Sequence, residues 1–152
     1  MRTKSKAGEA MYGFIECTVR QFMTRRVMTV KRQTTMRELA ALFEKHDFNA
    51  FPVVEEGKLF GIVSKFDFLR AFAFTANQVV PHYNELMSRP AVDVMTEAVV
   101  DVDPTSPLTR VLQLMVSLKT RSFPVMSAEG QLEGIFSRDV MRALKETTRE
   151  SE

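Results

Sequence analysis

The chain has 152 residues, of which 45% are hydrophobic and 26% are charged, and this composition is typical of a soluble globular protein. Its length suits one compact domain or two small subdomains that share a core. No apolar run approaches the roughly 18–20 residues that a membrane-spanning helix needs, and no signal peptide is expected at the N-terminus. The single cysteine, Cys17, excludes an intrachain disulfide and a metal site of clustered thiols. We therefore expect a protein of a reducing, cytoplasmic compartment.

The first part of the chain is basic. The formal net charge is +2, but residues 1–32 hold eight lysines and arginines and only two glutamates, Glu9 and Glu16. A basic end can bind nucleic acid or another polyanion, and it can equally be a solvated tail with a few surface arginines. The second interpretation is the simpler one, and we assign residues 1–18 to an N-terminal tail.

Residues 19–74 show the pattern of a mixed helix and strand unit. A short β-branched stretch at 27–30 predicts a strand, and Thr35 is a candidate N-cap for the helix that follows. Strands are then predicted at about 50–54 and 59–64 around a glycine-containing turn, and a closing helix from about Asp67. The apolar residues of the first helix recur at i, i+3, i+4 and i+7, which places them on one face: Met36, Leu39, Ala40 and Phe43.

Residues 91–145 repeat this order. A shift of 72 places Met23-Thr24 on Met95-Thr96, and a turn that is one residue longer changes the shift to 73, which places Gly61 on Gly134. In this copy Ser106 is the candidate N-cap, with Pro107 in the first turn. We expect an α+β fold of two β-α-β-β-α repeats, packed as a pseudo-twofold pair because about 55 residues are marginal alone. Residues 75–90 form the linker, and 146–152 a C-terminal tail.

The stretch GIVSKFD at 61–67 marks the point at which the last strand of the first copy passes into its closing helix. Backbone N–H groups are exposed at such a point, and a carboxylate in the first helical turn can accept hydrogen bonds from two hydroxyl groups, such as those of a ribose. Ser64 could equally cap the helix while Asp67 complements its dipole, without any ligand. The spacing alone leaves both interpretations open.

The ordered set of motifs resembles the CBS domain, and the tandem arrangement resembles a Bateman module. The likeness covers about 19–74 and 91–145. The stretches that carry it are VRQFMTRRVMTV, NAFPVVEEGKLFGIVSKFDFLRAF, VDVMTEAVVDV and RSFPVMSAEGQLEGIFSRDVMRAL.

The resemblance implies an adenine nucleotide in the cleft between the repeats: AMP, ADP or ATP, with S-adenosylmethionine as a related ligand. It implies that Asp67 holds the ribose hydroxyls and that Ser64 meets sugar or phosphate. It further implies a base pocket along residues 49–52, a bordering Thr29, and Lys65 placed to approach phosphate. The candidate binding residues are Thr29, Asn49, Ala50, Phe51, Pro52, Ser64, Lys65, Asp67, Arg121, Ser137, Arg138 and Asp139, of which Arg121 and Arg138 would come from the second copy.

The second copy departs from the pattern, because Asp139 follows Ser137 one residue sooner than Asp67 follows Ser64. One residue on a helix is a rotation of about 100°, enough to turn a carboxylate away from a sugar. In addition, the position of the second copy that matches Thr29 is occupied by an aspartate, Asp101. We expect one good nucleotide site, around Asp67, and a second that is degraded or empty.

No catalytic pattern is visible. The two histidines, His46 and His82, have no cluster of further metal-ligand residues around them, and no phosphate-binding glycine loop is present. We expect no enzyme, no metal and no required cofactor, but a regulatory module that changes conformation on binding a nucleotide. It would pair as a homodimer through its closing helices and act on a partner protein. The alternative is a ligand-free dimerisation or interaction module that docks on a protein or nucleic acid; no membrane partner is expected, and nucleic acid is the weaker option.

Overall fold

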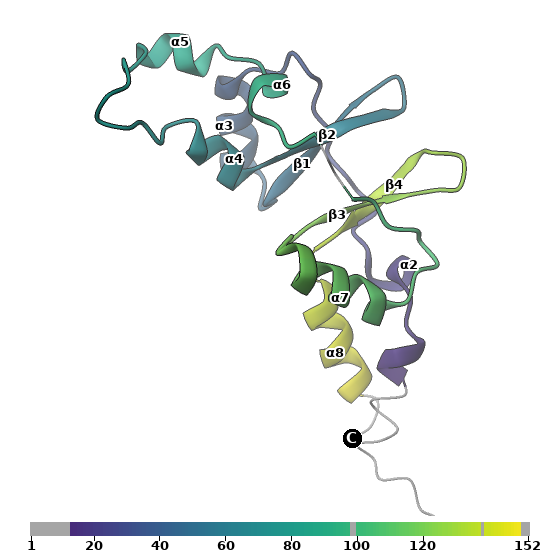
Figure 1. The fold of residues 1–152 in the computed structure, drawn as a ribbon. Coiled ribbons are helices and arrows are strands. Elements are labelled where there is room, and N and C mark those ends of the chain that lie inside the picture. The colour runs from purple at the N-terminus through teal and green to yellow at the C-terminus, as the bar shows by residue number, and fades with distance from the viewer. Residues whose placement is uncertain (1–12, 98–99, 138, 150–152) are drawn as a thin grey trace, which may run out of the picture. The chain divides into compact units, whose positions relative to one another are not determined.

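The computed structural model describes residues 13–97, 100–137 and 139–149. The chain divides into two compact units, each described by itself: one is Val27–Val99, and the other combines Met1–Arg26 with Val100–Glu152 (Figure 1). Both contain helices and a two-stranded antiparallel sheet, so the predicted mixed fold is confirmed.

The unit Val27–Val99 begins with a helix and a hairpin. Its elements are α3 (Met36–Lys45), β1 (Ala50–Glu55), β2 (Lys58–Ser64), α4 (Lys65–Arg70), α5 (Tyr83–Met87) and α6 (Ala91–Val94). The hydroxyl of Thr35 accepts the N–H of Glu38 at 3.2 Å, which confirms the predicted cap of α3. β1 and β2 pair antiparallel, and their turn carries Glu56 and Gly57 at φ 51° and 75°, a geometry that favours glycine at the second position.

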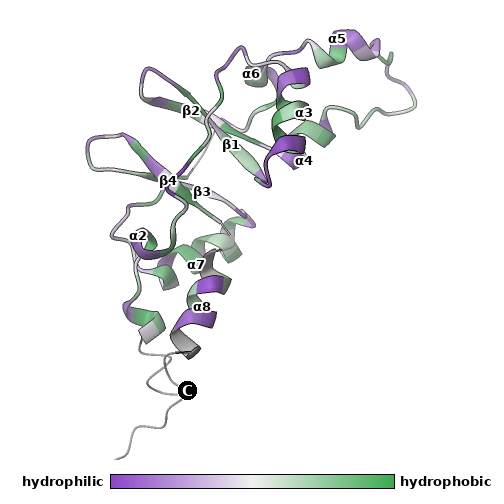
Figure 2. Ribbon diagram, turned by 180° about the vertical axis from the view of Figure 1, so that it is seen from behind, coloured by the Kyte–Doolittle hydropathy of each residue, from purple (hydrophilic) through white to green (hydrophobic). Residues whose placement is uncertain are grey.

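The core of this unit draws on segments that lie far apart in the sequence. Met36 and Leu39 of α3 pack with the inward side chains of β1 and β2, and α5 and α6 close the cluster. Figure 2 shows the same pattern as hydrophobic colouring along much of α3. The buried residues are Val30, Met36, Leu39, Phe51, Val53, Val63, Met87, Ala91 and Val94.

The predicted strand at 27–30 is shorter than expected. Only Val30 pairs, in a parallel bridge to Val53: its N–H donates to the Pro52 carbonyl and its carbonyl accepts the N–H of Val54, both at 2.9 Å. A turn closed by the Thr34 N–H and the Lys31 carbonyl begins directly afterwards, so the extended segment cannot continue along β1. Val102 forms the matching single bridge to Val125 in the other unit.

The second unit contains α2 (Val19–Phe22), α7 (Leu108–Leu118), β3 (Phe123–Met126), β4 (Leu132–Phe136) and α8 (Asp139–Arg149). Its core joins Val19 and Phe22 of α2 to the buried side chains of α7, β3, β4 and α8. The prediction of Ser106 as N-cap is wrong by one residue: Pro107 is the cap and α7 begins at Leu108. The carbonyl of Ser106 accepts the N–H of Val19 at 3.0 Å, which ties Ser106 to α2 instead.

Each unit takes its Met-Thr pair from the other repeat. Thr96 and Ile62 exchange backbone hydrogen bonds of 2.8 and 3.0 Å, and Thr24 and Ile135 do the same at 2.8 and 3.0 Å. The approach requires glycine beside each isoleucine, because a Cβ on Gly61 would lie 2.5 Å from the Thr96 carbonyl oxygen. The Met-Thr and Gly-Ile motifs of the two repeats are therefore the two sides of one backbone contact, made once in each unit.

Candidate functional site

The candidate site lies where β2 ends and α4 begins. Ser64 is the N-cap of α4, and its hydroxyl accepts the N–H of Asp67 at 3.0 Å. The carboxylate of Asp67 returns the interaction: its Oδ2 accepts the Ser64 N–H at 2.9 Å and the Ser64 hydroxyl at 3.0 Å. This is a capping box, so the interpretation of Ser64 as a helix cap is confirmed.

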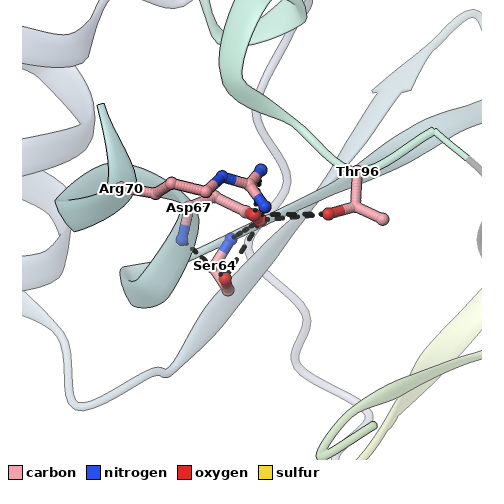
Figure 3. Close-up of polar contacts among 4 residues, drawn as sticks. All are labelled: Ser64, Asp67, Arg70 and Thr96. Carbon is pink, nitrogen blue, oxygen red and sulfur yellow. Dashed lines mark hydrogen bonds and ion pairs between the residues drawn. The ribbon is translucent and has the colours of Figure 1, made fainter. Parts of the chain in front are cut away.

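Two further side chains bond to the same carboxylate (Figure 3). Arg70 Nη2 donates to Asp67 Oδ1 at 2.9 Å, and Thr96 Oγ1 lies 3.3 Å from Oδ1 and 3.4 Å from Oδ2. Asp67 is only 4% exposed, whereas the Arg70 side chain is 55% exposed and Thr96 is exposed as well. Ser64 thus fixes the orientation of the carboxylate from inside, and Arg70 and Thr96 cover it on the side that solvent reaches.

Sequence reasoning missed Arg70 and Thr96. The spacing of Asp67 and Arg70, three residues apart on one helix, is a signal that could have found the ion pair. No local signal points to Thr96, which is 29 residues away in the sequence, because its place depends on the exchange of Met-Thr segments.

The residues predicted to border the base lie along the start of β1. The carbonyl of Asn49 accepts the N–H of Lys65 at 2.9 Å, so this strand start is held against the first residue of α4. Ala50 and Pro52 are buried, and Phe51 is fully buried, with its ring centroid 4.8 Å from that of Phe43. The side chain of Phe51 therefore belongs to the core, and only its backbone remains for the predicted contact. In the same unit Thr29 is exposed and Lys65 is half-buried.

The remaining predicted residues belong to the other unit. Arg121 is exposed and Ser137 is half-buried, while Arg138 lies outside the described residues. Asp139 is the first residue of α8, whereas Asp67 is the third residue of α4. The two aspartates therefore occupy different helical positions. Arg142 donates to the Phe22 carbonyl at 2.7 Å.

Charged contacts elsewhere in the described chain are structural. Arg32 bonds Glu55 through Nη2 at 2.8 Å and holds the pKa of that carboxyl below its ordinary value, mainly by the side-chain hydrogen bond. The hydroxyl of Thr105 likewise lowers the pKa of Asp103, which accepts it at 2.6 Å. Within the described residues, no group of three or more His, Cys, Asp or Glu side chains could hold a metal ion. None of the helices in the described ranges is long and apolar enough to cross a bilayer.

A model of the CBS domain matches residues 19–74 and, a second time, residues 91–146. The chain belongs to the CBS domain family. Protein MJ0188 of Methanocaldococcus jannaschii is 33% identical over 131 residues, which are 86% of this chain and 45% of that protein. The CBS pair described here therefore spans less than half of the length of this relative.

Solved CBS structures share the fold. The crystal structure of CBSX2 in complex with AMP superposes with a TM-score of 0.71 at 28% identity, covering 85% of this chain and 96% of that one; the protein of this name from Arabidopsis thaliana is chloroplastic. The CBS domain pair of protein MJ0100, in complex with methylthioadenosine and S-adenosylmethionine, also gives a TM-score of 0.71, with 86% and 96% coverage. At 23% identity this second likeness shows the fold alone.

Proposed function

We propose that this CBS pair is a regulatory module that binds an adenine nucleotide and is not itself an enzyme. The observation that carries the proposal is the carboxylate of Asp67, which Ser64 fixes on one side while the exposed Arg70 and Thr96 cover the other. Membership of the CBS family and the AMP complex of CBSX2 support this ligand class. AMP is the first candidate ligand, with ADP, ATP and S-adenosylmethionine as the others.

The ribose is the part of the ligand that Asp67 would bind. A carboxylate accepts up to about four hydrogen bonds, and the ones from Thr96 are the longest of those on Asp67, so the ribose hydroxyls can take their place. In this proposal the guanidinium of Arg70 and the ammonium of Lys65 remain available for phosphate, and backbone groups of residues 49–52 border the base. The site around Ser137 and Asp139 is proposed to be degraded, because Asp139 is the first residue of its helix whereas Asp67 is the third residue of α4.

Regulation would follow from a difference in affinity. A ligand shifts a conformational equilibrium only by as much as it binds one state more tightly than the other. We propose that a partner protein reads this shift, in a cytoplasmic setting.

Thermal unfolding with added nucleotide tests the proposal. A ligand present at about a hundred times its Kd stabilises the folded chain by about 2.7 kcal/mol, which raises Tm by several degrees in a domain of this size. Asp67→Ala is expected to remove most of the AMP-induced increase in Tm, and Asp139→Ala to leave it in place. Isothermal titration of each variant separates lost binding from the lower starting stability of Asp67→Ala.

The result against the proposal is equally plain. If AMP, ADP, ATP and S-adenosylmethionine all leave the Tm of the wild-type chain unchanged, nucleotide binding is wrong for these ligands. If Asp67→Ala and Asp139→Ala weaken binding equally, the ranking of the two sites is wrong.

A second candidate function is self-association without a ligand, which exposed apolar side chains on the closing helices favour. Phe66 and Leu69 of α4 are 70% and 64% exposed, and Met141 of α8 is 73% exposed. Burying such side chains contributes about 1.5–3 kcal/mol each, which favours covering these faces. The occupant proposed for them is a second copy of the chain. Sedimentation velocity should give a dimer for the wild type and a monomer for the double variant Leu69→Glu, Met141→Glu. A wild-type monomer at high concentration would remove this candidate.

A further inference from the structure

Thr96 makes the longest of the hydrogen bonds to Asp67, so its hydroxyl is the donor that a ligand could displace most easily. Its Oγ1 lies 3.3 and 3.4 Å from the two carboxylate oxygens, whereas the other donors lie at 2.9 to 3.0 Å. Hydroxyl donors usually approach oxygen to about 2.5–3.0 Å, and here one proton serves two acceptors. The hydroxyl of Thr96, an exposed residue, therefore covers the carboxylate without holding it tightly.

The backbone, not the hydroxyl, places Thr96 there. Its N–H donates to the Ile62 carbonyl at 2.8 Å and its carbonyl accepts the Ile62 N–H at 3.0 Å, next to Gly61. The hydroxyl can therefore leave Asp67 by a rotation of its side chain, and the backbone bridge, although less stable without the hydroxyl contact, still holds the residue. Removing the hydroxyl alone is for the same reason a clean experiment.

Thr96 also lies close in the sequence to the boundary between the two compact units. It belongs to the second CBS match, yet it packs in the unit that carries Asp67, and the chain enters the other unit at Val100. Its bridge to Ile62 is the last described bridge before that boundary. A change at Asp67 thus reaches, through one side chain, the backbone bridge between Thr96 and Ile62.

We propose that Thr96 is a built-in competitor of the ligand: its hydroxyl bonds to Asp67 in the free chain and is displaced by the vicinal hydroxyls of a bound ribose. This inference rests on the proposed function for the identity of the ligand. It adds an affinity-determining residue from the second repeat to the site of the first. Displacement also removes the hydrogen bond between the Thr96 hydroxyl and Asp67, which helps to hold Thr96 against Ile62. Binding at Asp67 therefore destabilises the Thr96–Ile62 backbone bridge, which precedes the boundary between the units.

The ligand-free arm of the test uses amide hydrogen exchange measured by NMR. A hydrogen bond of this kind contributes about 0.5–1.5 kcal/mol, so Thr96→Val should speed exchange of the Ile62 amide about 2- to 10-fold. In an Asp67→Ala background the same substitution should have no further effect. The amides of Thr24 and Ile135, which form the matching bridge in the other unit, serve as the internal reference. Equal effects of Thr96→Val in both backgrounds would show that the hydroxyl does not act through Asp67 and would overturn the inference.

The second arm measures AMP binding by calorimetry. Thr96→Val, which keeps the shape of the side chain but loses the hydroxyl, should bind AMP about 2- to 10-fold more tightly than the wild type. Thr96→Ser should bind like the wild type, and Thr24→Val, the matched change in the other unit, should have no effect. Unchanged or weaker binding by Thr96→Val, with AMP still bound by the wild type, would refute competition and leave the proposed function standing. If AMP binds neither the wild type nor any variant, the proposed function is refuted, and competition between Thr96 and the ligand is refuted with it. The exchange measurement would then still report on the contact between Thr96 and Asp67.

Discussion

Gly61 shows how one residue can decide whether a backbone contact forms. The Cβ that any other residue would carry here lies 2.5 Å from the Thr96 carbonyl oxygen, and Gly134 has the same relation to Thr24 at 2.6 Å. Neither glycine has a positive φ, unlike Gly57 and Gly130 in the hairpin turns. The glycine at 61 is therefore required by the close approach of another backbone and not by its own conformation.

Gly61→Ala should destabilise the chain by about 1–3 kcal/mol, the usual cost of forcing extra volume into a packed site. The neighbouring atom is a backbone oxygen that already accepts the Ile62 N–H, so it cannot move aside without breaking the bridge. Urea unfolding followed by circular dichroism measures the change. Gly57→Asn is the control, because that position meets no atom within 4 Å and asparagine tolerates a positive φ. A Gly61→Ala chain as stable as the wild type would mean that the bridge is dispensable.

At the scale of elements, the sequence pattern predicted a helix, which depends on neighbouring residues, better than the length of a strand, which depends on a distant partner. The apolar spacing of 36–43 and the Thr35 cap gave α3, because a helix is defined by neighbours three and four residues away. The β-branched stretch at 27–30 predicted a strand, but strand length depends on a distant partner, and only Val30 reaches β1.

The candidate site divides in the same way. The cap formed by Ser64 and Asp67 could be predicted, since the capping box is a local motif. The degraded second site, predicted from the spacing of Ser137 and Asp139, stays a prediction. The burial of Phe51 in the core and the contact from Thr96 could not be predicted, because both follow from tertiary packing. The repeated Met-Thr pair was visible in the sequence, but its destination in the opposite repeat was not.

At the scale of the whole molecule, the repeats and the compact units have different bounds. The first CBS match ends at residue 74, whereas the unit that carries Asp67 continues to Val99. That unit completes its core with Met87, Ala91 and Val94, which are 4%, 0% and 8% exposed. The stretch between the repeats is thus partly a structural element of this unit, through α5, and not only a connection.

A fragment of residues 27–99 should therefore fold, and a fragment of nearly equal length, 1–74, should not. The first retains every buried residue of its core, while the second lacks Met87, Ala91 and Val94 and leaves Gly61 and Ile62 without their bridge. Burial of Met87 and Val94 contributes about 3–6 kcal/mol together, which is comparable to the whole stability of a small domain. Urea titration should give a cooperative transition for 27–99 and a gradual change for 1–74, with amide dispersion in NMR spectra as a second measure. A cooperative transition in 1–74 and none in 27–99 would mean that the repeat, and not the exchanged unit, is what folds.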